Sequence, residues 1–243
     1  MLTEQQIRRA LNGRILVITG AGISADSGIP TFRGKDGYWR KLDPMKLATP
    51  EAFRANPQLV WEWYLYRRKI VSEAQPNAGH EVIAKLSHTA REFLLVTQNV
   101  DDLHERAGTR SERMVKVHGD LFLNRCFSAS CAEQNRVTVS HYALPTCGKC
   151  SSLLRPGVVW FGESLDPATI QRVDDFISEA PCDLVLLIGT TAQFGYIVHW
   201  AMRAAGASGL VAEINPDDTG LNSVVECAIR EKASIALPRL FKI

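Results

Sequence analysis

The chain has 243 residues, and 46% of them are hydrophobic, which fits one large domain with a sizeable core. Its formal net charge at pH 7 is +2 and it contains no long basic run, so the composition argues against nucleic acid as a partner. The polar N-terminus lacks the apolar core of a signal peptide, and the longest apolar run, 184–188, is too short to cross a bilayer, so we expect a soluble, cytoplasmic protein without a membrane partner.

Four short, β-rich apolar runs predict buried strands, and they cover residues 14–19, 92–97, 183–188 and 209–214. Stretches of helical character lie between them, for example 167–179 and 194–205. Strands that alternate with helices favour an α/β fold, in which a Rossmann-like parallel sheet carries helices on both faces.

Two stretches interrupt this alternation. Residues 34–80 hold many aromatic and charged residues but no strand-like run, and we interpret them as a helical insertion. Residues 120–157 hold four clustered cysteines and little apolar periodicity, which indicates a small metal-held module. The rest of the chain, about 1–33, 81–119 and 158–243, then forms the larger, Rossmann-like part of a single catalytic domain.

A glycine loop, Gly20-Ala21-Gly22, directly follows the first predicted strand. Glycines at this place let a backbone approach a pyrophosphate group. The spacing is not a complete G-x-G-x-x-G, so a tight turn from strand to helix explains these residues equally well. The following segment, 24–33, is rich in Gly and Pro and suits a loop over a ligand.

Polar residues follow the second predicted strand in the run TQNVDDLH, residues 97–104, and HGD follows at 118–120. The carboxyl ends of parallel strands are where α/β proteins bind ligands. Taken singly, the two pieces are explained by a polar strand end and a surface histidine. Together with GAGISADSGIPTFRG they resemble the cofactor loop and the catalytic pair of the sirtuins, a resemblance that spans about residues 12–235.

The sirtuin resemblance implies NAD-dependent protein lysine deacylation, which yields nicotinamide, O-acyl-ADP-ribose and free lysine. Asn99 and Asp101 would hold the carboxamide and the ribose in the reactive pose, and His118 would be the general base for a ribose hydroxyl. His104 is expected to be structural. The implied NAD contacts in this half of the chain are Gly20, Ala21, Gly22, Asp26, Phe32, Arg33, Gln98, Asn99 and Asp101.

Four cysteines, Cys126, Cys131, Cys147 and Cys150, form two knuckles. Four thiolates suit a tetrahedral zinc ion, and a site closed by four sulfur ligands is structural. Disulfides are the alternative, but they are uncommon in a reducing compartment. Sirtuins carry such a zinc module in the same place, after HGD. The other two cysteines are expected to be buried as small apolar residues.

Two further segments resemble sirtuin substrate sites. VVWFGE is a short extended run that resembles the segment pairing with the substrate backbone, and it comprises Val158, Val159, Trp160, Phe161, Gly162 and Glu163. Tyr64 and Arg67 share one face of a predicted helix, as in any amphipathic helix. In a sirtuin, the pair resembles the acidic-acyl pocket of the desuccinylase branch, where Arg67 would bind a terminal carboxylate and Tyr64 would add a hydrogen bond. Succinyl or malonyl lysine would then be substrates beside acetyl lysine; a generic deacetylase is the alternative.

Small and polar residues also follow the third and fourth predicted strands. Gly189-Thr190-Thr191 and Asn215 resemble the family motifs that hold the cofactor phosphates and the adenosine ribose. The stretch 192–196 departs from the family pattern because it lacks the usual valine and proline. Ala233 is assigned to the adenine pocket.

Three other functions compete with this interpretation. An ordinary Rossmann dehydrogenase would explain the glycine loop but not the cysteines, and no ribose-binding acid follows the second predicted strand. A zinc-ribbon nucleic-acid binder would require a basic face, against which the near-neutral charge argues. Transfer of ADP-ribose to protein from the same NAD site stays open as a side activity.

Overall fold

The protein is described here by a computed structural model that covers residues 2–31, 43–139 and 143–242. Its main element is a six-stranded sheet in which every neighbouring pair is parallel, with the order β3-β2-β1-β7-β8-β9. The strands are β1 (Arg14–Thr19), β2 (Glu92–Thr97), β3 (Met114–Lys116), β7 (Leu184–Ile188), β8 (Leu210–Ile214) and β9 (Cys227–Ile229). The predicted α/β fold is therefore confirmed, and β3 and β9 are short edge strands that the sequence did not reveal.

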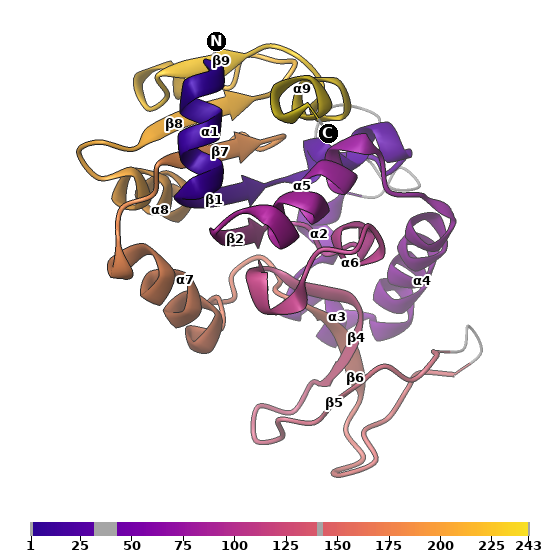
Figure 1. The fold of residues 1–243 in the computed structure, drawn as a ribbon. Coiled ribbons are helices and arrows are strands. Elements are labelled where there is room, and N and C mark those ends of the chain that lie inside the picture. The colour runs from indigo at the N-terminus through magenta and orange to yellow at the C-terminus, as the bar shows by residue number, and fades with distance from the viewer. Residues whose placement is uncertain (1, 32–42, 140–142, 243) are drawn as a thin grey trace.

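Helices cover both faces of the parallel sheet (Figure 1). Ile15 and Val17 of β1 point to one face, which is covered by α1 (Glu4–Asn12), α5 (Ala78–Thr89) and α9 (Ala233–Phe241). Leu16 and Ile18 point to the other face, which is covered by α7 (Pro167–Glu179) and α8 (Gly195–Ala205). Because both faces are buried, the strands are apolar throughout instead of alternating with polar residues.

Three helices occupy the described part of the predicted helical insertion: α2 (Pro44–Leu47), α3 (Pro50–Ala55) and α4 (Pro57–Glu73). Each begins with a proline in the first turn, after a capping side chain from Asp43, Thr49 or Asn56. Trp61 of α4 donates a hydrogen bond from its indole nitrogen to the Leu154 carbonyl at 2.9 Å, which ties the insertion to the cysteine module.

The cysteine module is built on a three-stranded antiparallel sheet with the order β5-β4-β6, at the lower end of the molecule in Figure 1. Its strands are β4 (Gly119–Cys126), β5 (Gln134–Asn135) and β6 (Leu154–Val158). The sequence did not predict these strands, because GDLFLNRC, QN and LRPGV are neither continuous apolar runs nor regular alternations of apolar and polar residues. The shorter elements of the chain are η1 (Ala21–Ser27), α6 (Leu103–Arg106), η3 (Ser111–Arg113) and η4 (Leu221–Ser223).

The strand order reverses at the centre of the sheet, where a crevice for a ligand is expected. The chain passes from β1 outward to β2 and β3, and then returns to β7 on the other side of β1. Ligands of open α/β sheets bind outside the carboxyl ends of the strands at such a reversal. Among the described residues, no helix is long and apolar enough to span a membrane.

Candidate active site

The polar motifs found in the sequence converge at the carboxyl edge of the parallel sheet. Gly20–Gly22 follow β1, Gln98–Asp101 follow β2, His118 follows β3, Gly189–Thr191 follow β7 and Asn215 follows β8. Parallel strands direct all of these segments toward one edge, so residues far apart in the sequence line one crevice.

The glycines allow two loops of this edge to approach each other closely. The Gly22 amide donates to the Gly189 carbonyl at 2.8 Å. A Cβ atom added to Gly22 would lie 2.7 Å from the Gly189 Cα, so no side chain fits between the loops. Gly20 is the N-cap of the 3₁₀ helix η1 and Gly22 lies in its first turn, so a tight turn after β1 is also present. The loops after β1 and β7 therefore form one continuous backbone surface.

A buried polar network lies behind this surface. The side-chain amide of Asn99 donates from Nδ2 to Ser24 Oγ at 3.1 Å, and the Ser24 hydroxyl donates to Asp101 Oδ2 at 3.0 Å. His80 of α5 accepts the Asn77 amide at Nδ1, so its neutral ring carries the hydrogen on Nε2, which faces Ser24 Oγ at 3.4 Å. Burial lowers the pKa of His80 to about 4 and raises the pKa of Asp101. The network thus holds Asn99 and Asp101 in fixed orientations.

His118 is oriented through both of its ring nitrogens. Nδ1 lies 2.9 Å from the Gln98 carbonyl oxygen, which can only accept, so the neutral ring carries its hydrogen there. The lone pair of Nε2 then faces the Tyr196 hydroxyl at 2.6 Å. Burial lowers the pKa of His118, although the Gln98 carbonyl acts in the opposite direction. His118 is therefore a neutral imidazole at pH 7 with its basic nitrogen in the crevice.

A chain of hydrogen bonds links the segments that follow β2, β7 and β8. Gln98 donates from its side-chain amide to Thr190 Oγ1 at 2.8 Å, and Asn215 donates to the Thr190 carbonyl at 3.2 Å. The structure thereby brings together three of the residues expected to contact NAD. Thr191 lies next to them in the same loop.

Two other expected NAD contacts lie where η1 meets the start of α9. Asp26 is bound by Lys232 at 2.8 Å and also accepts a hydrogen bond from Ser234, which links η1 to the start of α9. Ala233 is buried at the first position of α9, against Gly79 of α5. Phe32 and Arg33 lie outside the described residues.

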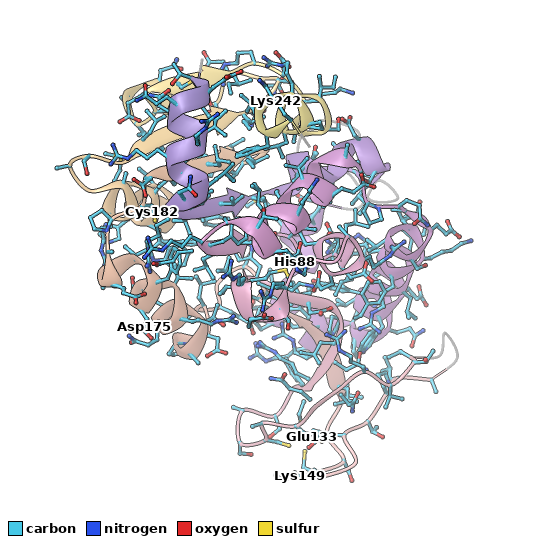
Figure 2. The ribbon with its side chains drawn as sticks, in the orientation of Figure 1. His88, Glu133, Lys149, Asp175, Cys182 and Lys242 are labelled. Atoms are coloured by element: carbon cyan, nitrogen blue, oxygen red, sulfur yellow. The ribbon has the colours of Figure 1, made fainter. Side chains whose placement is uncertain are left out.

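The four cysteines form one compact cluster. All four Sγ atoms lie within 4.8 Å of one another, with Cys126 and Cys150 at 3.4 Å and Cys131 and Cys147 at 3.8 Å. Thiolates around a tetrahedral zinc ion lie about 3.8 Å apart, because each Zn–S bond is about 2.3 Å long. The cysteines are free thiols, which argues against the disulfide alternative. Glu133 and Lys149, which lie in the same loops as these cysteines, are at the lower end of the molecule in Figure 2, away from the parallel sheet.

The predicted acyl-binding pair lies on α4 and is fully inside the protein. Tyr64 is 0% exposed and Arg67 is 4% exposed. The Tyr64 hydroxyl accepts a hydrogen bond from the Trp160 indole at 2.8 Å, and the Arg67 guanidinium lies 4.8 Å from the centre of the Trp63 ring. Burial lowers the pKa of Arg67, whereas the neighbouring Tyr64 hydroxyl and the Asp101 carboxylate act to raise it. The guanidinium is therefore within electrostatic reach of the Ser24 network.

The VVWFGE segment is extended only at its beginning, so the expectation of an extended run is wrong for its second half. Val158 ends β6, and the Glu163 amide donates to the Trp160 carbonyl at 3.0 Å around Gly162, whose φ is 84°. The turn forms because the Glu163 carboxylate accepts from the Trp160 amide at 2.8 Å and pairs with Arg155. Val159 donates to the His118 carbonyl at 2.8 Å, which joins this segment to the site.

Comparison with known proteins supports the assignment that the motifs suggested. Residues 20–195 match the model of the Sir2 family. The chain belongs to the Sir2 family. It is 42% identical over 230 residues to an NAD-dependent protein deacylase of Aquifex aeolicus, covering 95% of each chain. It is also 41% identical over 233 residues to the mitochondrial NAD-dependent protein deacylase sirtuin-5 of the dog, covering 84% of this chain and 73% of that protein.

Solved structures of Sir2 proteins have the same fold. A Sir2 homologue in complex with NAD superimposes with a TM-score of 0.89 at 40% identity, covering all of this chain and 93% of the other. The sirtuin resemblance drawn from the sequence is thus confirmed.

Three residues of this Sir2 site were not singled out in the sequence. Ser24 lies inside the quoted cofactor motif, so its position was visible although its partners were not. His80 lies in an ordinary helical stretch, and no local pattern marked it. Tyr196 lies in the stretch that departs from the family pattern, and that departure was the signal available for it.

Proposed function

We propose that this NAD-dependent protein deacylase removes acidic acyl groups, such as succinyl and malonyl, as well as acetyl groups from lysine side chains of proteins. The products are nicotinamide, O-acyl-ADP-ribose and free lysine. The observation that carries the acyl preference is the buried Arg67 guanidinium beside Tyr64, within electrostatic reach of Asp101.

The arrangement of the site supports the catalytic role proposed for each residue. When bound, NAD supplies a ribose carbon at which nicotinamide is the leaving group and the acyl-lysine oxygen the nucleophile. Asn99 and Asp101 hold the carboxamide and the ribose, because Ser24 fixes both side chains through hydrogen bonds. His118 accepts a proton from a ribose hydroxyl at Nε2, since the Gln98 carbonyl keeps the hydrogen of the neutral ring on Nδ1.

The rest of the NAD molecule would lie along the carboxyl edge of the sheet. The loops after β1 and β7 pack against each other through Gly20, Gly22 and Gly189, and together with Ala21 they would border the phosphates. Gln98, Thr190 and Asn215 face the sugars through their linked hydrogen bonds, with Thr191 beside them. Asp26 and Ala233 border the site through the contact between η1 and α9.

The acyl group extends from the reacting lysine toward α4. Arg67 pairs with the terminal carboxylate, and a planar guanidinium can donate two parallel hydrogen bonds to it. Tyr64 accepts its bond from the Trp160 indole, so the hydrogen of its own hydroxyl can be donated to the same carboxylate. An acetyl group offers no carboxylate to either residue.

The substrate main chain lies against the segment 158–163. The amides of Val159, Trp160 and Phe161 already donate to the His118 carbonyl, the Glu163 carboxylate and the Ala48 carbonyl. A substrate strand would therefore pair with the carbonyl groups of this segment, or displace one of these bonds. Main-chain pairing of this kind tolerates many peptide sequences.

The zinc ion has a structural role in this proposal. Cys126, Cys131, Cys147 and Cys150 fill all four positions of a tetrahedral ion, which leaves no position for a reacting water. The ion would hold together the loops at the end of the β4–β6 sheet, because little apolar surface is buried there.

One peptide carrying acetyl, malonyl or succinyl lysine tests the proposal. The enzyme should release nicotinamide and acyl-ADP-ribose in equal amounts from NAD, with a higher kcat/KM for the two acidic acyl groups. A higher kcat/KM for acetyl lysine would contradict the acyl preference. Nicotinamide release accompanied by ADP-ribosylated protein, without deacylation, would instead show that the site is an ADP-ribosyltransferase.

A further inference from the structure

The catalytic histidine has a partner that the family pattern does not provide. In the stretch 192–196 the usual valine and proline are absent, and Phe194 and Tyr196 stand there. Both aromatic rings contact His118 at the start of α8. We propose that Tyr196 caps the catalytic base: its hydroxyl holds Nε2 of His118 in the NAD-free protein and is displaced by a ribose hydroxyl when NAD binds.

The direction of the hydrogen bond follows from the two ends of the imidazole. Nδ1 of the neutral ring carries the hydrogen and donates it in a hydrogen bond to the Gln98 carbonyl, so Nε2 can only accept. The Tyr196 oxygen lies 2.6 Å from Nε2 and must be the donor. Burial raises the pKa of Tyr196 to about 12, so the phenol keeps its hydrogen at neutral pH. The cap is thus a phenol that donates to a neutral base.

Aromatic packing holds the tyrosine ring in place. Phe194 stacks on it with 5.6 Å between ring centres, and Trp200, one turn further along α8, packs against it edge-on at 5.0 Å. Phe194 also contacts the His118 ring edge-on at 5.5 Å and is itself 43% exposed. Tyr196 is itself only partly buried, so an entering ligand can displace its hydroxyl from the base.

The cap and the substrate compete for one lone pair. Nε2 of a neutral imidazole accepts a single hydrogen bond, so it cannot hold the phenol and the ribose hydroxyl at the same time. This inference rests on the proposed role of His118 as the base that receives the ribose proton. A neutral hydrogen bond is worth about a 2- to 10-fold change in an equilibrium constant. Binding of any ligand that carries this ribose should be weakened by that factor.

Calorimetric titration with ADP-ribose and with ADP tests the cap without any turnover. ADP has the adenosine and both phosphates but lacks the second ribose, so it is the matched control ligand. Tyr196→Phe keeps the ring and its packing, and this variant should bind ADP-ribose about 2- to 10-fold more tightly while its affinity for ADP stays the same. In a His118→Ala background, the same substitution should change neither affinity, because the group that the hydroxyl caps is gone.

Other results would overturn the cap. Weaker ADP-ribose binding by Tyr196→Phe, no change, or equal changes for both ligands would mean that the hydroxyl supports the loop or the ligand instead. A gain that persists in the His118→Ala background would also contradict it. The proposed function is tested separately by the turnover of the His118→Ala variant: activity retained there would remove the base assignment, whatever the titrations show.

Discussion

Replacing Arg67 by Met tests how the site recognises the acyl group, because the change removes the guanidinium and keeps an unbranched side chain. Only 4% of the Arg67 surface is exposed, so water contributes little to the solvation of any group bound there. A carboxylate buried without a cationic partner is costly. The variant should therefore bind a succinyl group poorly, whereas an acetyl group loses no ionic contact.

The expected size of the effect follows from the lost contact. A hydrogen bond to a charged group contributes about 1.5–3 kcal/mol, which corresponds to about a 10- to 150-fold change in kcat/KM. Arg67→Met should lower kcat/KM for succinyl lysine by this factor and for acetyl lysine by a few-fold only. The substitution also removes the Arg67 guanidinium from the Trp63 ring, which should reduce the free energy of unfolding by about 0.5–2 kcal/mol. Thermal unfolding is therefore recorded for each variant.

The assay compares kcat/KM for one peptide carrying either acyl group, at saturating NAD. Tyr64→Phe removes only the hydroxyl and should reduce succinyl turnover less than Arg67→Met does. Lys69→Met is the matched control on the same helix, because the Lys69 side chain is 71% exposed and should affect neither substrate. Equal losses on both peptides in Arg67→Met would refute the reasoning and assign Arg67 to the fold.

Three further predictions concern the base and the metal. His118→Ala should reduce deacylation by about 10²- to 10⁴-fold while NAD binding, measured by calorimetry, is largely kept; near wild-type turnover would contradict the assignment. The acidic limb of kcat/KM against pH should have its midpoint below 6.5, because burial lowers the pKa of His118 and the base acts in its neutral form, which persists above that pKa; a midpoint well above 6.5 would argue for another group. Metal analysis of the purified protein should find one zinc per chain, and Cys147→Ser should lower the unfolding temperature, since metal binding energy is folding energy here; active, soluble protein without zinc would rule this out.

The sequence predicted the central strands, the polar edge of the sheet and the metal cluster, because each of these features is encoded by residues that are close together in the chain. Apolar runs such as 14–19 and 184–188 predict strands buried on both faces, and the polar residues directly after them mark the carboxyl edge of the sheet. The four cysteines are two close pairs, so their spacing predicts a metal cluster without knowledge of the fold around it. Motif order along the chain was sufficient to identify the family.

The tertiary structure decided which partners these residues have. Ser24 meets Asn99 and Asp101 only because β1 and β2 are neighbours in the sheet, and His80 joins them from a helix that packs on one face. Contacts of this kind depend on the path of the chain between the residues, which no local pattern encodes. Sequence reasoning therefore found the groups that react but not the network that orients them.

The same reason explains where the structure differs from the expectations. Residues 158–163 were expected to be extended, yet Arg155 and the Trp160 amide bind the Glu163 carboxylate and close a turn there. Tyr196 had no assigned role, yet the return of the chain from β7 into α8 places its hydroxyl on His118, 78 positions away in the sequence. Residue type and order determined the chemistry of this protein, whereas the three-dimensional path determined its geometry, because hydrogen bonds form between groups that the fold brings within about 3 Å of each other.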